Sequence, residues 1–283
     1  MKKRLRFSKM HGLGNDFILI DGINQRIDDK DLSSLARTMC DRNFGIGADG
    51  LIIALKSDST DIKMRVINSD GSEPEMCGNG IRCFSKFVYE KKLIEKVVFS
   101  VETLAGNMVQ ALIIKDGVVV SVEVDMGEPI LIAKDIPVVS DTDQAVCKPI
   151  DILGKTYEFT AVSMGNPHAV VFLDDLKTID LEKIGPLFES HSNFPEKINT
   201  EFVQIVNPNE SILIVWERGT GETLACGTGA CASVVAGVLN KKCERKVKVH
   251  LPGGSLMIEW QEHDNHLVMT GPAELVFDGQ IEI

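Results

Sequence analysis

Two short segments share the pattern Cys-Gly-X-Gly, one beginning at Cys77 and the other at Cys226. Both precede sequences with helical character. Glycine permits a tight turn with positive φ and lets a ligand approach the backbone closely. The first turn of a helix has unpaired N–H groups and a positive partial charge, so an anion such as a carboxylate can bind there. The same environment predicts a lowered pKa and high reactivity for the two thiols.

The two motifs also lie at equivalent places in a weak internal repeat. In both halves a strand is followed by a turn that contains glutamate, then by Cys-Gly-X-Gly and a helix. The repeat predicts two similar domains, each presenting one cysteine at a helix start. A thiolate from one domain could remove a proton from a substrate carbon, while the thiol of the other delivers a proton to the opposite face. Such a pair inverts a stereocentre without a cofactor.

The other five cysteines lack this glycine context. Cys83 and Cys231 follow the motif cysteines by less than two helical turns, and the two thiols of each pair point in different directions around a helix. The spacings are poor for a four-cysteine zinc site, and we expect no metal. We interpret these two, and three others, as core cysteines. The three others are Cys40, Cys147 and Cys243.

The elements that must position the two motifs are mostly strands. The chain has 283 residues, enough for about two domains. Helices are predicted over 31–40, 80–92 and 229–240, the last apolar on all sides and therefore buried. Runs rich in β-branched residues predict strands at 17–20, 51–55, 97–101, 118–124, 169–173, 211–216, 246–251 and 256–260. This pattern predicts an α+β fold of sheets wrapped on helices, with a domain boundary near residues 123–128.

Composition excludes several classes of protein. Hydrophobic residues make up 44% and charged residues 25%, as in an ordinary globular chain. The net charge of −11 predicts no broad basic footprint for nucleic acid. No secretory signal and no apolar run of about 20 residues is evident, so we expect a cytoplasmic protein with reduced thiols and no membrane partner.

Known cofactor motifs give no further candidate. The segment 45–50 matches G-x-G-x-x-G, but a strand-like run follows it in place of a helix, so we reject it as a nucleotide loop. No site for pyridoxal phosphate is evident.

Eight motifs, in order along nearly the whole chain, resemble those of diaminopimelate epimerases. They begin at His11, Phe44, Asn68, Met76, Gly165, Asn199, Trp216 and Ala225. The resemblance implies a cofactor-independent isomerase that interconverts LL- and meso-diaminopimelate. It implies a homodimer of chains with two pseudo-symmetric β-barrel-like domains, each around a central helix, with the active site in the cleft between them. Residues 1–122 with 272–283 would form the N-terminal epimerase domain, and 123–271 the C-terminal one.

The resemblance also implies roles for single residues. Cys77 and Cys226 match the catalytic acid and base, while His168 and Glu217 match positions that modulate the thiol pKa values. The residues that match substrate-binding positions are Asn15, Asn68, Gly78, Asn79, Asn166, Asn199, Glu217, Arg218, Gly227 and Thr228. One departure is Gly50, where some members carry a glutamine that reaches the substrate. Thr200, where valine is common, is a minor change.

Three other interpretations remain open. The first is another two-cysteine racemase, similar to proline racemase, although the His11 and Trp216 motifs fit the diaminopimelate family better. The second is a ligand-binding module without turnover, whose glycine-rich loops only hold an anion. The third is a redox-regulated protein in which Cys77 and Cys226 form a disulfide, which is compatible with catalysis.

Overall fold

The computed structural model describes residues 4–27 and 29–282. The chain divides into two compact units, which we call unit 1 (Met1–Val124 with Thr270–Ile283) and unit 2 (Asp125–Met269). Both contain many strands and few helices, which confirms the α+β class. All eight predicted strands are present, and the three predicted helices begin within two residues of their expected positions.

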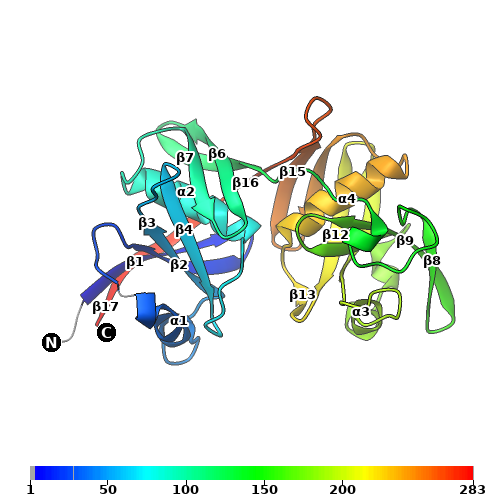
Figure 1. The fold of residues 1–283 in the computed structure, drawn as a ribbon, viewed down its shortest axis with the longest axis horizontal. Coiled ribbons are helices and arrows are strands. Elements are labelled where there is room, and N and C mark those ends of the chain that lie inside the picture. Colours follow the sequence, from blue (N-terminus) through cyan, green and yellow to red (C-terminus); the bar gives the residue numbers. More distant parts are fainter. Residues whose placement is uncertain (1–3, 28, 283) are drawn as a thin grey trace. The chain divides into compact units, whose positions relative to one another are not determined.

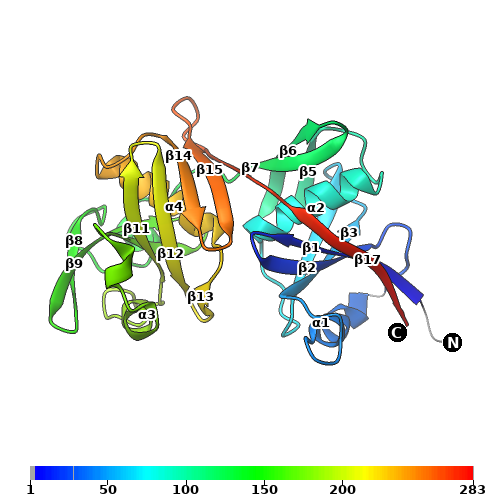
Figure 2. The same ribbon diagram turned by 180° about the vertical axis from the view of Figure 1, so that it is seen from behind.

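Unit 1 is a curved sheet packed on helix α2 (Gly78–Glu90), with α1 (Leu32–Cys40) beside β3 and β4 (Figures 1 and 2). A short 3₁₀ turn, η1 (Asp29–Asp31), precedes α1. In order across the sheet, the strands are β17 (Glu274–Glu282), β1 (Arg4–Gly12), β2 (Asn15–Asp21), β3 (Gly50–Leu55), β4 (Ile62–Asn68), β5 (Val98–Thr103), β6 (Gly106–Lys115) and β7 (Val118–Asp125).

Unit 2 has the same plan, with helix α4 (Gly227–Leu239) against its sheet and α3 (Leu181–Glu189) packed on β11, β12 and β13. In order across the sheet, its strands are β8 (Lys148–Ile152), β9 (Lys155–Ser163), β10 (Pro167–Phe172), β11 (Asn199–Asn207), β12 (Glu210–Glu217), β14 (Lys246–Leu251) and β15 (Gly254–Trp260). The remaining elements are β13 (Gly221–Thr223), β16 (Leu267–Gly271), η2 (Ala133–Asp135) and η3 (Leu176–Thr178).

The two units repeat one pattern of strand pairing. Neighbouring strands from β1 to β6 pair alternately antiparallel and parallel, beginning with the antiparallel pair of β1 and β2. In unit 2 the neighbouring strands β9, β10, β11, β12, β14 and β15 alternate in the same order, beginning with the antiparallel pair of β9 and β10. A helix makes each parallel crossover, namely α1 and α2 in unit 1 and α3 and α4 in unit 2. Equivalent helices thus carry Cys77 and Cys226, and both α2 and α4 have 13 residues.

Alternation along the central strands separates the two faces of each sheet. In unit 1, Ile18 and Leu51 belong to a core with α1, whereas Ile52 on the opposite face reaches Gly80 of α2. In unit 2, Phe202 belongs to a core with α3, and its neighbour Glu201 reaches the first turn of α4. The motif-bearing helices therefore lie on equivalent sheet faces.

Among the described residues, no helix combines the length and apolar character needed to cross a bilayer.

Candidate active site

Both motif cysteines are helix N-caps. Cys77 and Cys226 have extended backbones, and each sulfur accepts a hydrogen bond from the third residue of the following helix. The Gly80 N–H lies 3.4 Å from Cys77 Sγ, and the Gly229 N–H lies 3.3 Å from Cys226 Sγ. The predicted position of one cysteine at the start of a helix in each half is confirmed, although the helices begin two residues earlier than expected.

The motif glycines serve a different purpose from the one predicted. Gly78 and Gly227 begin the helices, and none of the four glycines adopts a positive φ. Gly80 and Gly229 instead permit close packing, because a Cβ at Gly80 would lie 3.0 Å from Ile52 and one at Gly229 would lie 2.5 Å from Glu201. The expectation of a left-handed turn is therefore wrong for these glycines.

Around Cys77 the structure brings together three of the predicted residues. The Cys77 thiol lies 3.7 Å from Asn15 Oδ1, which also accepts a hydrogen bond from Asn79 Nδ2 at 3.3 Å. Asn15 in turn donates to Asp49 at 2.7 Å. Cys77 is partly exposed. The thiol therefore lies beside side-chain amides that could orient a polar substrate.

Asn68 and Gly50 face each other across β3 and β4. The Asn68 amide donates to Ser72 Oγ at 3.0 Å. A Cβ at Gly50 would lie 3.0 Å from the carbonyl oxygen of Ile67, so this backbone leaves little room for a side chain at that position.

An ion-pair cluster fixes the strand start that carries Asn15. Asp16 contacts Lys9 at 2.5 Å and Arg42 at 2.8 Å, and its side chain is 17% exposed. Burial acts to raise the pKa of Asp16, but Arg42 and Lys9 outweigh burial and hold that pKa at about 2. The carboxylate therefore stabilises the fold above the pKa of about 3.9 expected in the unfolded chain, and this contribution is lost as the pH falls toward 2.

We expect Asp16→Asn to remove about 1 kcal/mol of stability at neutral pH, after allowance for solvent screening. The unfolding free energy of the variant should also fall less than that of the wild type between pH 5 and pH 2.5. Denaturant titrations across this range measure both effects. Asp58→Asn, at an exposed loop position, is the control, and equal pH slopes for wild type and Asp16→Asn would contradict the assignment.

Arg82 is a functional candidate that the sequence reasoning missed. Its side chain is fully buried and donates to the carbonyl oxygens of Gly78 and Pro272, at 2.9 and 3.2 Å, and to Asn79 Oδ1 at 2.9 Å. It thus ties the first turn of α2 to the segment that leads into β17. An arginine inside a helix with otherwise buried positions was the available signal, because charged residues are seldom fully buried without partners.

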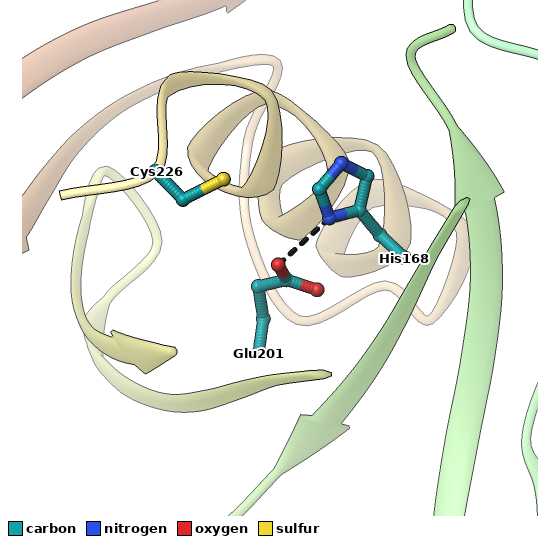
Figure 3. Close-up of side chains that lie close together, drawn as sticks. All are labelled: His168, Glu201 and Cys226. Atoms are coloured by element: carbon teal, nitrogen blue, oxygen red, sulfur yellow. Dashed lines mark hydrogen bonds and ion pairs between the residues drawn. The ribbon is translucent and has the colours of Figure 1, made fainter. Parts of the chain in front are cut away.

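Around Cys226 a compact polar cluster is enclosed in unit 2 (Figure 3). His168 Nδ1 lies 2.7 Å from Glu201 Oε1, and both side chains are fully buried. His168 Nε2 lies 3.0 Å from Asn166 Oδ1. The ligand atoms of His168, Glu201 and Cys226 all lie within 4.8 Å of one another. Cys226 is itself 5% exposed and lies 3.4 Å from Thr228 Oγ1.

This environment reverses the prediction of a lowered thiol pKa at Cys226. Burial, followed by the carboxylates of Glu217 and Glu201, raises the pKa of the Cys226 thiol well above 9. The hydrogen bonds from Thr228 and Gly229 act in the opposite direction and are outweighed. Burial also raises the pKa of Glu217, with Glu201 adding to the effect and Thr223 opposing it. Desolvation and like charge therefore dominate over the helix N-terminus.

The other predicted residues of unit 2 form a second group. Asn199 is buried, donates to the carbonyl oxygen of Pro167 at 2.7 Å, and accepts from the Arg218 N–H at 2.9 Å. Glu217 accepts a hydrogen bond from Thr223 Oγ1. The Arg218 side chain is exposed and donates to the carbonyl oxygen of Glu196 at 3.1 Å. Backbone atoms thus hold the side chains of Asn199 and Arg218, and the Thr223 hydroxyl holds Glu217.

The other cysteines match the prediction only in part. Cys40, Cys83 and Cys231 are buried core residues, and burial raises the pKa values of Cys40 and Cys83 to about 12. Cys243 is partly buried, outside any helix. Cys147 is exposed before β8, so its interpretation as a core residue is wrong.

Within residues 4–27 and 29–282, the donor atoms of His168, Glu201 and Cys226 form one group close enough to share a metal ion. His168 Nδ1 and Glu201 Oε1 already engage each other, and the expectation that the protein needs no metal stays a prediction. Glu201 was missed by the sequence reasoning, although an acidic residue inside an apolar strand was a usable signal.

A sequence model described as diaminopimelate epimerase matches residues 7–132 and 160–276. The chain belongs to the diaminopimelate epimerase family. It is 53% identical over 279 residues to a diaminopimelate epimerase of Methanococcus maripaludis strain C5, covering 99% of this chain and 100% of the relative. It is 55% identical over 272 residues to one of Desulfitobacterium hafniense, covering 96% of each.

Solved structures confirm the two-domain, barrel-like fold expected of a diaminopimelate epimerase. A phenazine biosynthesis protein of the PhzF family from Bacillus anthracis has a TM-score of 0.72 at 15% identity, covering 99% of this chain and all of that one. A hydroxyproline epimerase from Agrobacterium vitis has a TM-score of 0.69 at 15% identity, covering 99% and 92%. At this identity the likeness concerns the fold alone.

Proposed function

We propose that this chain is a cofactor-independent epimerase that interconverts LL- and meso-diaminopimelate. One observation carries the proposal: Cys77 and Cys226 are N-caps of equivalent helices in two units with the same strand pattern, in a chain of the diaminopimelate epimerase family. A two-base inversion needs one sulfur for each face of the α-carbon. The domain assignment, with residues 1–122 and 272–283 in the N-terminal epimerase domain and 123–271 in the other, is part of this proposal.

The proposed reaction balances without an external reagent. A thiolate takes the α-proton, so that the C–H bond breaks, an S–H bond forms, and the electron pair stays on the α-carbon. The opposite thiol then gives up its proton, so that its S–H bond breaks and a C–H bond forms on the other face. The two sulfurs exchange protonation states in each turnover, and the reverse reaction starts from the exchanged form.

The helix starts and the nearby amides would bind the substrate. Helices α2 and α4 begin at Gly78 and Gly227, and the N-terminus of each helix attracts a carboxylate through its free backbone N–H groups. The Arg218 guanidinium could bind a carboxylate through two hydrogen bonds. The proposed substrate contacts are Asn15, Asn68, Gly78, Asn79, Asn166, Asn199, Glu217, Arg218, Gly227 and Thr228. We further propose a cytoplasmic homodimer that acts on this small molecule and binds neither nucleic acid nor membrane.

We expect solvent deuterium to appear at the α-carbon when the wild type turns over LL-diaminopimelate in heavy water. The reason is that the proton delivered comes from a thiol that exchanges with solvent. Mass spectrometry of the product, with proline assayed in parallel, distinguishes the alternatives. Label in proline alone would favour the proline racemase-like alternative, and binding without label would favour a module without turnover.

A further inference from the structure

The two motif cysteines have different surroundings at equivalent positions. In unit 1, β2 and β3 pair Phe17 with Gly50, and in unit 2, β10 and β11 pair His168 with Asn199. Two residues further along β3 and β11 are Ile52 and Glu201, which face Gly80 and Gly229 of the equivalent motifs. An apolar pair in unit 1, Phe17 and Ile52, thus corresponds to an ionisable pair in unit 2.

Glu201 is held against the first turn of α4. Its Oε1 lies 2.7 Å from His168 Nδ1 and would be 2.5 Å from a Cβ at Gly229, so only glycine leaves room for the carboxylate. Its Oε2 is buried without a hydrogen-bond partner among the described residues. A buried carboxylate with an unsatisfied oxygen is costly, and stability alone gives no reason for a carboxylate where the equivalent position in unit 1 is isoleucine.

His168 is enclosed by acceptors on both sides. Nδ1 faces Glu201 Oε1, and Nε2 faces Asn166 Oδ1. Glu201 thereby fixes the orientation of the ring toward Asn166, one of the proposed substrate contacts.

We propose that Glu201 is a positioning residue that orients His168 and keeps Cys226 as the protonated thiol of the free enzyme. This inference rests on the proposed function and assigns Cys226 as the proton donor of the resting enzyme. The ionisable groups that face Cys226 are Glu201, Glu217 and His168, together with the positive N-terminus of α4. Burial and the two carboxylates outweigh the helix terminus, which supports the assignment.

The test is the pH dependence of Cys226 alkylation in the substrate-free protein. Iodoacetamide reacts with the thiolate, and mass spectrometry of the digest follows Cys226 and Cys231 separately between pH 6 and pH 10. In Glu201→Gln we expect alkylation of Cys226 to be about 10-fold faster at a fixed pH, because one negative charge beside the sulfur is removed. Cys231 is fully buried, and its slow reaction in the same digest reports an intact core.

Glu210→Gln is the matched control, because Glu210 pairs with His250 at 2.7 Å elsewhere in unit 2. It should leave the Cys226 profile unchanged. Glu201→Asp keeps the negative charge but moves it away from the sulfur. Its alkylation profile should therefore lie between those of wild type and Glu201→Gln. If the glutamine variant does not fold, the comparison of Glu201→Asp with wild type tests the inference. An unchanged or slower profile in the Glu201 variants overturns the inference. A wild type without epimerase activity overturns the proposed function and leaves this measurement intact.

Discussion

Cys77→Ala and Cys226→Ala should each reduce epimerisation of LL-diaminopimelate by about 10³-fold or more, because each variant lacks the proton acceptor or donor on one face of the α-carbon. Neither change should unfold the protein, since alanine retains the extended backbone of the N-cap. Each variant loses the hydrogen bond from the third helical residue, worth about 1 kcal/mol, together with the contact of the sulfur with Asn15 or Thr228. Turnover is measured with reductant present, and circular dichroism confirms the fold.

Cys147→Ser is the matched control, because this thiol is exposed and lies outside both motifs. It should retain full activity. Wild-type turnover in either motif variant would contradict the two-base proposal. Loss of activity in all three variants would instead point to a general sensitivity of the chain to cysteine replacement.

Arg82→Met should lower the unfolding free energy by about 3 kcal/mol and should also impair turnover. The substitution keeps the apolar volume but removes the donor to the buried Asn79 Oδ1 and to the part-buried carbonyl oxygens of Gly78 and Pro272. Polar groups that lose their partner inside a protein account for losses of this size. Denaturant unfolding gives the stability, and kinetics on the folded fraction gives the activity.

The control replaces an arginine of the same sheet. Arg4 pairs with Glu282, and its side chain is 72% exposed, so Arg4→Met should cost less than about 0.5 kcal/mol. Equal costs at the two positions would mean that the buried hydrogen bonds of Arg82 contribute nothing beyond a surface ion pair.

Sequence patterns located the central elements because these elements satisfy local rules. Apolar periodicity and β-branched runs identified α2, α4 and four of the strands between them, namely β5, β7, β10 and β12. The strands β6, β8, β9, β11 and β13, and the helix α3 with Pro186 inside it, were not predicted. The sequence also placed Cys77 and Cys226 at equivalent helix starts. These are local properties of the chain.

The environment of Cys226 could not be predicted in this way. Burial raises the pKa of its thiol, and Glu217 and then Glu201 add to the rise. Glu201 lies on β11 and reaches the first turn of α4 from the sheet. The helix N-terminus is visible in the sequence, but the burial and the carboxylates that outweigh it are tertiary. Arg82 was overlooked for a similar reason, because its partner Pro272 lies at the other end of the chain.

The return of the chain to unit 1 sets an order of events during synthesis. Strand β17 pairs along β1, and all of unit 2 lies between them in the sequence. Ribosomes make the N-terminus first, yet the sheet edge at β1 stays open until β17 emerges, and by then every strand of unit 2 is available to pair. Unit 1 therefore begins first and completes its sheet last. A chain that lacks β17 would carry an unpaired edge at β1, of the kind that promotes aggregation.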